Sequence, residues 1–256
     1  MMTPYTTNSR STVDVAIKLT NVGKRFGTTW AVKNLDLSVP KGSIFAFLGP
    51  NGAGKTTTLR LISGLLFPTE GTISVLGMNP LHDWIPVRRA LSYIPDVPFL
   101  YGKLTGDEFL RFVGGLHEIP NDALSLKIER FVSLFDLRQY HTKRVESYSH
   151  GTRQKYVVTA ALLSSPEVLL VDEPMVGLDP MSSRILKDLF REQADNGTSI
   201  LLSTHTLSVA QELADFIGVI DHGSLVVSGS RGELLTDTSE HSLEKLFLSL
   251  TAREDR

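Results

Sequence analysis

The sequence predicts an α/β protein with a mainly parallel sheet, an N-terminal antiparallel β layer and an inserted α-helical subdomain. Three observations support this fold class. A glycine-rich loop separates a buried strand from a helix in the first half of the chain. Strand-turn-helix units recur from Val168 onward, which is typical of a parallel sheet flanked by helices. Between these regions, over residues 97 to 160, the pattern is that of amphipathic helices.

Composition excludes several classes of protein. The 256 residues suffice for one domain that carries an insertion. The 26 Lys and Arg residues nearly balance the 28 Asp and Glu residues, so we expect no nucleic-acid partner. The absence of cysteine excludes disulfides and thiolate metal sites, and it fits a reducing compartment. No apolar run approaches the ~20 residues that a membrane span needs, so we expect a chain that does not cross a membrane alone.

The N-terminal region predicts a tail and then a β layer. We expect residues 1–13, which are rich in Thr, Ser and Asn, to be a disordered tail and not a signal peptide. Alternating stretches at Ala16–Leu19 and Thr29–Val39 predict strands, with a turn at Lys24–Gly27 between them. Pro40, Lys41 and Gly42 end the second strand.

The glycine-rich loop is a phosphate-binding motif of the form Gly-x-x-x-x-Gly-Lys-Thr. It follows a strand at Ser43–Leu48 and precedes a helix at Thr57–Leu65, and it reads Gly49-Pro50-Asn51-Gly52-Ala53-Gly54-Lys55-Thr56-Thr57. Its glycines let the backbone turn N–H groups inward at a helix N-terminus, where the helix dipole also favours anions. The alternative is a glycine-rich turn that caps an ordinary helix. The full motif favours a P-loop NTPase core.

Each residue type in the loop has a predicted task. Lys55 would reach the β- and γ-phosphates of a nucleoside triphosphate, and Thr56 would place its hydroxyl on Mg²⁺. The backbone of Gly49, Gly52, Gly54 and Thr57, together with Asn51 in the same loop, would close the nucleotide cradle.

A short strand at Thr72–Leu76 and a helix at Asp83–Ala90 follow the loop helix. Within the inserted block, Thr105 and Glu108 predict a capping box at the start of one helix, and a second helix runs from about Ala123 to Phe135.

The second half alternates strands and helices. We expect strands at Val168–Val171, Ser199–Ser203, Ile217–Ile220 and Leu225–Val227 and helices at Pro180–Gln193 and Thr206–Ala214. A short amphipathic helix at Ser242–Leu250 ends the chain after an irregular link.

Two carboxylates end the apolar strand Val168–Val171. Asp172 would hold Mg²⁺, and Glu173 would polarise or deprotonate the attacking water, as in a Walker B element. The alternative is a buried strand followed by an acid that caps a helix.

Further motifs make the chain resemble the nucleotide-binding subunit of an ABC transporter, from Val15 onward. Residues Ser149 to Lys155 resemble the signature Leu-Ser-Gly-Gly-Gln-x-Gln, and Gly177-Leu178-Asp179 resembles the D-loop. Phe26 resembles the aromatic that stacks on adenine, although a core aromatic is the simpler alternative. His205 resembles the switch histidine that contacts the γ-phosphate.

The resemblance implies an ATPase that uses ATP and Mg²⁺. It implies an ABC ATPase domain over residues 14–232, with a C-terminal link and short helix over residues 233–256. In the family, two subunits pair head to tail, so that the signature of one copy, with Ser149 and Gly151, completes the ATP site of the other. Asp179 of the D-loop is a further expected nucleotide-binding residue. It further implies a homodimer bound to a separate transmembrane permease at the cytoplasmic face of the membrane.

Four positions depart from the family pattern. Tyr148, His150 and Thr152 replace Leu, Gly and Gln of the signature. Asp96 stands where the family's Q-loop has Gln, so its carboxylate could still contact Mg²⁺ and nucleotide but cannot donate a hydrogen bond as an amide does.

The apolar stretch Val97–Tyr101 either packs internally or lines a cleft that receives a helix of the permease. The signature variant and the C-terminal helix are most similar to exporter-type systems. Two alternatives are an ABC-type ATPase that acts on ribosomes or DNA, which predicts tandem ATPase domains or a basic arm, and a nucleotide-switched regulatory module with little turnover.

Overall fold

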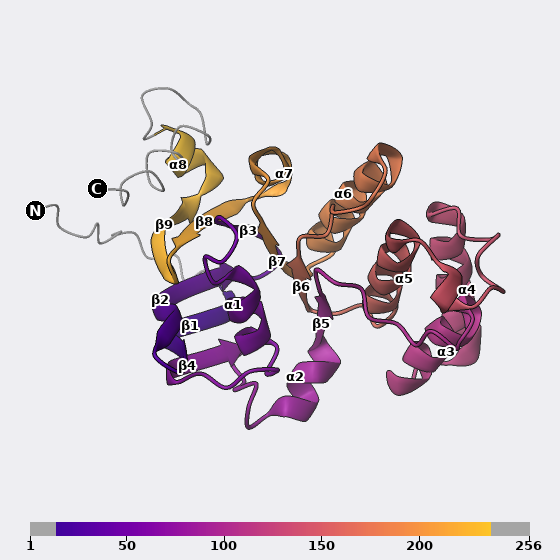
Figure 1. Ribbon diagram of the computed structural model, residues 1–256, viewed down its shortest axis with the longest axis horizontal. Coiled ribbons are helices and arrows are strands. Elements are labelled where there is room, and N and C mark those ends of the chain that lie inside the picture. The colour runs from indigo at the N-terminus through magenta and orange to yellow at the C-terminus, as the bar shows by residue number, and fades with distance from the viewer. Residues whose placement is uncertain (1–13, 237–256) are drawn as a thin grey trace, which may run out of the picture.

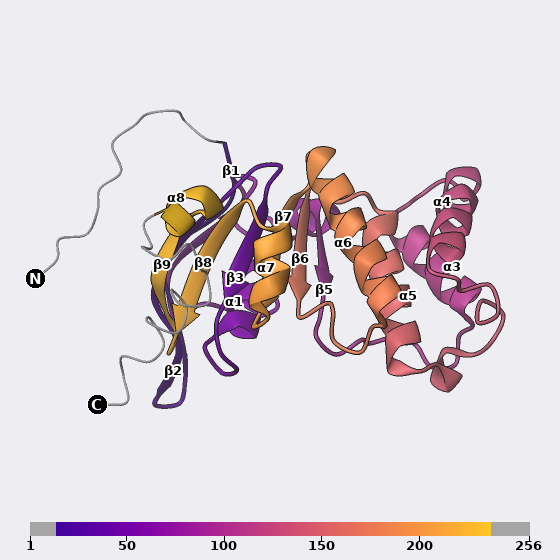
Figure 2. The same cartoon turned by 90° about the horizontal axis from the view of Figure 1, so that it is seen from above.

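The computed structural model describes residues 14–236. The predictions for residues 1–13 and for the helix at Ser242–Leu250 lie outside these residues. The described chain forms two sheets and a helical block, and the helical block lies at the end far from the antiparallel sheet (Figures 1 and 2).

The smaller sheet is antiparallel and has the strand order β2-β1-β4. Its strands are β1 (Val15–Phe26), β2 (Thr29–Pro40) and β4 (Glu70–Val75). The strand expected at Thr72–Leu76 is therefore the third member of the predicted antiparallel layer. Because β1 continues to Phe26, the turn expected over residues 24–27 is confined to Gly27 and Thr28.

The larger sheet has six strands in the order β5-β6-β7-β3-β8-β9. Their bounds are β3 (Ile44–Leu48), β5 (Leu91–Ile94), β6 (Val168–Asp172), β7 (Ser199–Thr204), β8 (Phe216–Asp221) and β9 (Ser224–Ser230). The pairs among β5, β6, β7, β3 and β8 are parallel, which confirms the mainly parallel sheet.

Strand β9 is a correction to the expected parallel arrangement, because it pairs antiparallel with β8. Only His222 and Gly223 connect the two strands, and both have positive φ, 45° and 81°. A two-residue connection of this conformation makes a hairpin, whereas a parallel pair requires a crossover of a dozen or more residues.

Helices cover both faces of the larger sheet. Helix α1 (Lys55–Ile62) packs between the two sheets, with Leu59 and Ile62 in one core with Leu170 of β6. Helices α5 (His150–Leu163) and α6 (Pro180–Asp195) contribute to the core that contains Leu169 and Val171. Because side chains alternate along β6, its even-numbered residues face α1 and its odd-numbered residues face the opposite helices. The remaining helices near this sheet are α2 (Trp84–Ala90), α7 (Leu207–Leu213) and α8 (Arg231–Thr236).

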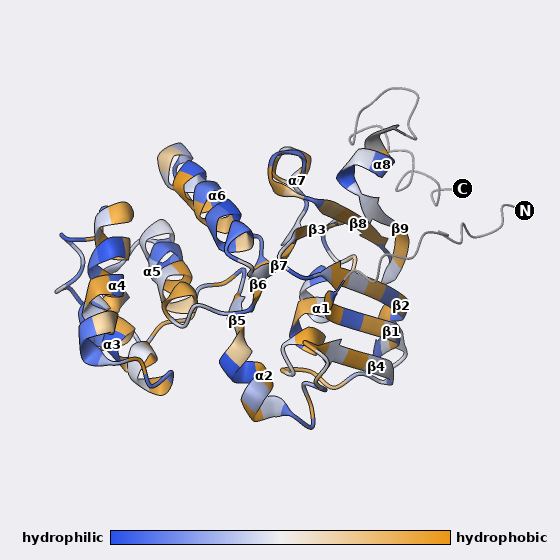
Figure 3. Ribbon diagram, turned by 180° about the vertical axis from the view of Figure 1, so that it is seen from behind, coloured by the Kyte–Doolittle hydropathy of each residue, from blue (hydrophilic) through white to orange (hydrophobic). Residues whose placement is uncertain are grey.

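The inner strands are the most apolar part of the fold. Every residue of β3 and β6 is buried, whereas β1 and β2 alternate buried and exposed residues. Figure 3 shows this contrast as nearly continuous orange along β3 and β8 and as stripes along β1, β2 and β4.

The helices between β5 and β6 match the pattern expected for residues 97 to 160. They are α3 (Gly106–Leu116), α4 (Asn121–Leu134), the short 3-10 helix η1 (Val145–Ser147) and α5. The capping box is confirmed, because Glu108 N donates to Thr105 Oγ1 at 3.2 Å and Thr105 N donates to Glu108 Oε2 at 2.8 Å. The division of the chain at residues 14, 97, 160 and 232 remains a prediction.

Within residues 14–236, no helix is both long enough and apolar enough to cross a bilayer.

Candidate active site

The glycine-rich loop leads directly into α1, which begins at Lys55 and so two residues earlier than expected. Gly54 caps this helix with φ of 107°, a conformation that side-chain-bearing residues rarely adopt. A Cβ at this position would also lie 2.5 Å from the carbonyl oxygen of Ala31. Glycine is therefore required here, and the first N–H groups of α1 remain available to an anion.

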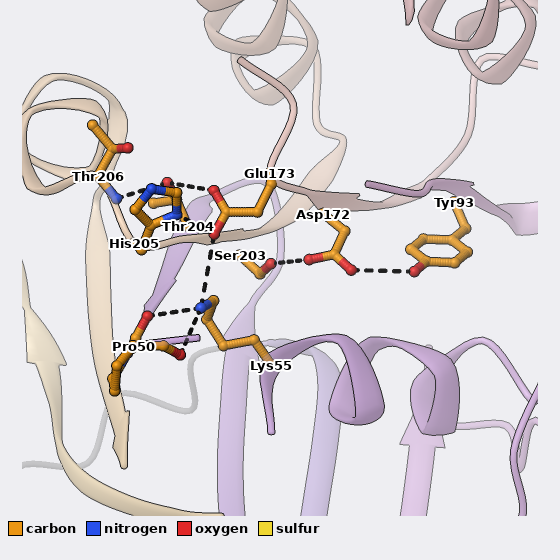
Figure 4. A network of polar contacts seen from close by, with 10 residues as sticks. Pro50, Lys55, Tyr93, Asp172, Glu173, Ser203, Thr204, His205 and Thr206 are labelled. Atoms are coloured by element: carbon orange, nitrogen blue, oxygen red, sulfur yellow. Dashed lines mark hydrogen bonds and ion pairs between the residues drawn. The ribbon is translucent and has the colours of Figure 1, made fainter. Parts of the chain in front are cut away.

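Lys55 lies against the loop, with its side chain 7% exposed. Its Nζ donates to the carbonyl oxygens of Gly49 and Pro50 at 2.7 and 3.1 Å, and it lies 3.7 Å from Glu173 Oε1 (Figure 4). Burial lowers the pKa of Lys55, while the nearby charges of Glu173 and Asp172 oppose this shift. The ammonium group thus stands between the loop and the two carboxylates.

Asp172 ends β6 and is fully buried. Its Oδ1 accepts a short hydrogen bond from Ser203 Oγ, and its Oδ2 lies 3.5 Å from the Tyr93 hydroxyl (Figure 4). Burial raises the pKa of Asp172, and hydrogen bonds from Ser203 and Thr56 oppose this shift. A buried carboxylate whose hydrogen-bond donors are neutral hydroxyls is suited to a cation.

Glu173 follows in the left-handed conformation, with φ of 46°. Its Oε2 accepts from Thr204 Oγ1 at 3.2 Å, and its Oε1 lies 2.8 Å from His205 Nδ1. Strands β6 and β7 are parallel neighbours, so their carboxyl ends lie at the same edge of the sheet. The fold therefore joins the predicted catalytic pair, Glu173 and His205, although 31 residues separate them in the sequence.

One cavity of about 210 Å³ gathers most of the predicted nucleotide and metal residues. It is lined by Ala31, Asn51, Gly52, Gly54, Lys55, Thr56, Thr57, Asp96, Asp172 and Glu173. Asp96 is one of the charges that raise the pKa of Asp172. Phe26 lies outside this lining, half exposed, with Lys24 Nζ 5.1 Å from its ring centroid.

The donor set of this cavity fits Mg²⁺. Thr56, Asp96 and Asp172 offer hydroxyl and carboxylate oxygens, the ligands that Mg²⁺ prefers. Among the described residues, no group of three or more His, Cys, Asp or Glu side chains could hold a metal by itself.

The signature residues lie in a second cavity of about 520 Å³, which includes Ser149, His150, Gly151 and Asp179 in its lining. Ser149 caps α5 by accepting from Thr152 N at 3.2 Å. A Cβ on Gly151 would lie 2.7 Å from the carbonyl oxygen of Gly177, so this close approach requires glycine. In the described part of the chain, the two cavities have no lining residue in common.

Asp179 caps α6, as its position before Pro180 indicates. It accepts from Ser182 N at 2.9 Å and from Ser182 Oγ at 2.6 Å. These hydrogen bonds lower the pKa of Asp179 to about 2. The expected capping role of Asp179 is confirmed, and its D-loop role stays a prediction.

The fold accommodates two of the departures from the family signature by hydrogen bonding. The buried Tyr148 hydroxyl donates to the carbonyl oxygens of Tyr140 and Lys143 at 2.7 and 3.0 Å. The Thr152 hydroxyl lies 2.9 Å from Ser149 Oγ. The first contact joins the segment before α5 to residues 140 and 143, and the second lies in the first turn of α5.

Sequence reasoning missed the side chains that hold the two carboxylates, namely Tyr93, Ser203 and Thr204. A signal was present for two of them, because Ser203 and Thr204 are polar residues at the end of the apolar strand β7. The strand β5, which carries Tyr93, was also not predicted, since it has only four residues.

Comparisons with known proteins agree with this geometry. A family model described as ABC transporter matches residues 32–176. The daunorubicin resistance ATP-binding protein DrrA3 of Streptomyces coeruleorubidus is 36% identical over 88% of this chain and 71% of its own length. The bacitracin transport ATP-binding protein BcrA of Enterococcus faecalis is 35% identical over 87% of this chain and 71% of its own length.

Among solved structures, one described as the ATP binding subunit of an ABC transporter superposes with a TM-score of 0.85. It is 29% identical and covers 92% of this chain and 99% of its own.

Proposed function

Since this chain belongs to the ABC transporter family and is an ATPase of the kind that serves as ATP-binding subunit, we propose that it powers a membrane exporter as a head-to-tail homodimer. The P-loop NTPase fold and the cavity that contains Lys55 support the ATPase site.

Different residues of one chain bind phosphate, hold the metal ion and accept the proton in hydrolysis. Lys55 would bind the β- and γ-phosphates, and Thr56, Asp172 and Asp96 would hold Mg²⁺. When bound there, the ion would neutralise charge that develops on the phosphate oxygens. Glu173 lines this cavity, and its carboxylate is placed to accept the proton of the attacking water. His205 pairs with Glu173 and stays half exposed, so it can also reach the γ-phosphate.

The main support for a dimer is the separation of the two predicted anion sites within one chain. The α5 N-terminus with Ser149 and Gly151 belongs to a different cavity from Lys55. One chain therefore does not bring its own signature to its own phosphate-binding loop. A second copy in head-to-tail orientation presents its signature to the open side of the first site, and ATP then stabilises the interface by binding both.

An apolar groove next to this site fits a permease segment. Val97 and Phe99 are 70% and 75% exposed, which favours the cleft reading of this stretch over internal packing. With Tyr93 and other side chains they line a cavity of about 620 Å³, whose described lining contains Arg60 and Arg88 but no Asp or Glu. Such a groove fits an amphipathic helix that carries a carboxylate among apolar residues. We place this contact at the cytoplasmic face of the membrane.

The relatives favour transport over the alternatives. DrrA3 is named for daunorubicin resistance and BcrA for bacitracin transport, and both names fit export of a harmful compound. Nothing in these names points to ribosomes or DNA. The presence of Glu173 beside His205 favours turnover over a nucleotide switch without hydrolysis.

The experiment that tests the proposal is isolation of this subunit from native membranes. We expect a polypeptide with several membrane spans to co-purify in a fixed ratio, and we expect that complex to hydrolyse ATP faster than the isolated subunit. Co-purification with ribosomal proteins or nucleic acid instead would contradict the transport role. In the isolated protein, size-exclusion chromatography with light scattering should show a nucleotide-dependent dimer, and a monomer at saturating ATP would contradict the shared site.

A further inference from the structure

Tyr93 lines the apolar groove described above, and its side chain reaches Asp172, the carboxylate proposed to hold the metal. It lines the same cavity as Val97 and Phe99, and its hydroxyl lies 3.5 Å from Asp172 Oδ2 (Figure 4). In the register of β5 and β6, Tyr93 is opposite Leu170, two residues before Asp172. Leu170 and Asp172 face the same side of the sheet, so the long tyrosine side chain runs diagonally toward the end of β6.

Arg60 continues this contact toward the groove surface. It is exposed on α1 and lines the groove beside Tyr93. Burial raises the pKa of the Tyr93 hydroxyl, and the Arg60 guanidinium opposes that rise. Arg60 also lies one helical turn after Thr56, which lines the same cavity as Asp172. The phenol therefore donates to the carboxylate, and the guanidinium is the positive charge that acts on the phenol from the side of the groove.

The three groups Arg60, Tyr93 and Asp172 are polarised in one direction, from the guanidinium through the phenol to the carboxylate. A charged donor strengthens the donor that follows it, and the final acceptor here is a buried anion. The 3.5 Å separation of the last two groups is long for a hydrogen bond, so a small shift of Tyr93 changes that contact strongly. Hydrogen bonds to a ligating carboxylate fix its orientation toward the metal, and their loss typically costs about 10- to 100-fold in metal affinity.

We propose that Tyr93 is a positioning residue that couples the position of the Arg60 guanidinium in the groove to the orientation of the Asp172 carboxylate. Tyr93 thereby sets the affinity of the nucleotide site for its metal ion. This inference rests on the proposed function, because it takes the groove as the permease site. A carboxylate of the docked helix that pairs with Arg60 draws the guanidinium away from Tyr93 and weakens the hold on Asp172. Docking then alters metal binding through a route that does not pass through the loop residue Asp96.

The isolated protein allows a direct test without the permease. Mn²⁺ is titrated in the presence of a non-hydrolysable ATP analogue, and free Mn²⁺ is followed by electron paramagnetic resonance. We expect Tyr93→Phe, which removes only the hydroxyl, to raise the half-saturating Mn²⁺ concentration about 10-fold. Arg60→Ala should also raise the half-saturating Mn²⁺ concentration. The double variant should match Tyr93→Phe alone, because both changes act through one contact.

Arg88→Ala is the matched control. Arg88 lines the same groove, but its guanidinium lies over the Trp84 ring at 5.3 Å and has no described contact with Tyr93. The half-saturating Mn²⁺ concentration of the Arg88→Ala protein should stay within twofold of that of the wild type. Because Arg60 is exposed, its replacement leaves the core intact, and thermal melts of all variants identify any general loss of structure.

The outcomes separate this inference from the proposed function. Tyr93→Phe with unchanged Mn²⁺ affinity overturns the positioning role. Additive effects of Arg60→Ala and Tyr93→Phe, or an equal effect of Arg88→Ala, overturn the transmission from the groove. If the wild-type protein binds no Mn²⁺ together with the nucleotide, the proposed ATPase site itself is wrong.

Discussion

Replacing Glu173 by Gln tests the central chemical assignment. The substitution removes the proton acceptor and one negative charge while it keeps the shape of the side chain. The amide oxygen still accepts from Thr204, which lies 3.2 Å from Glu173 Oε2, so the loop geometry is retained. The amide loses the ion pair with Lys55 at 3.7 Å, and this frees the ammonium group for phosphate. We therefore expect nucleotide binding to persist while hydrolysis stops.

The expected magnitude follows from the role of the carboxylate as a base. A positioned general base contributes about 100- to 10,000-fold to a rate, which is about 2.7 to 5.4 kcal/mol of barrier height. The cleavage rate in a single turnover should fall by this factor, and the ATP-bound dimer should accumulate in size-exclusion chromatography. Glu192→Gln is the control, since Glu192 is an exposed residue of α6 that pairs with Arg130 at 2.6 Å.

The result that refutes the assignment is a Glu173→Gln protein that hydrolyses ATP at the wild-type rate. A loss of ATP affinity equal to the loss of rate would also count against it, because the base is not expected to contribute to ground-state binding.

Three further predictions concern nucleotide binding, stability and docking. Lys55→Ala should weaken ATP binding at least about 10-fold by calorimetry, because two phosphates lose a charged donor, while Lys41→Ala, which removes a surface pair with Asp14, should leave it unchanged. Asp179→Ala should destabilise the protein by about 0.5–2 kcal/mol and lower the melting temperature by a few degrees, since α6 loses its cap. The pKa of Asp179 lies at about 2, below its usual 3.8, so this stabilisation is complete above about pH 4 and is lost as the pH falls toward 2; equal acid sensitivity of the wild type and Asp179→Ala in unfolding titrations would contradict it. Phe99→Asp should abolish co-purification of the membrane partner without changing ATP affinity, because Phe99 is 75% exposed in the groove.

Local chemistry explains why much of the site was predictable. The glycine-rich loop, the capping box at Thr105 and the two acids after Val171 are each encoded within a few consecutive residues. Their function depends on short-range geometry, which residue type and spacing largely determine. Fold class was predictable for a similar reason, since buried parallel strands are continuous apolar runs.

Element ends and short strands were less predictable. Helix α1 begins at Lys55 because Gly54, in the left-handed conformation, ends the loop there. The residue types at positions 55 to 57 are equally compatible with a helix that begins at Thr57. The orientation of β9 depends on a two-residue hairpin at His222 and Gly223, which is antiparallel by geometry although its flanking runs resemble those of the parallel strands.

The sequence by itself determined the phosphate-binding loop, the acids that follow β6 and the alternation of strands and helices, because these depend on neighbours along the chain. Only the tertiary structure decided that Ser203 holds Asp172, that Tyr93 reaches the same carboxylate across 79 positions, and that Ser149 lies in a different cavity from Lys55. The physical reason is that an apolar strand is compatible with many neighbours. The order β5-β6-β7-β3 follows from how all the helices and strands bury their apolar faces together, and that order selects which distant polar side chains meet.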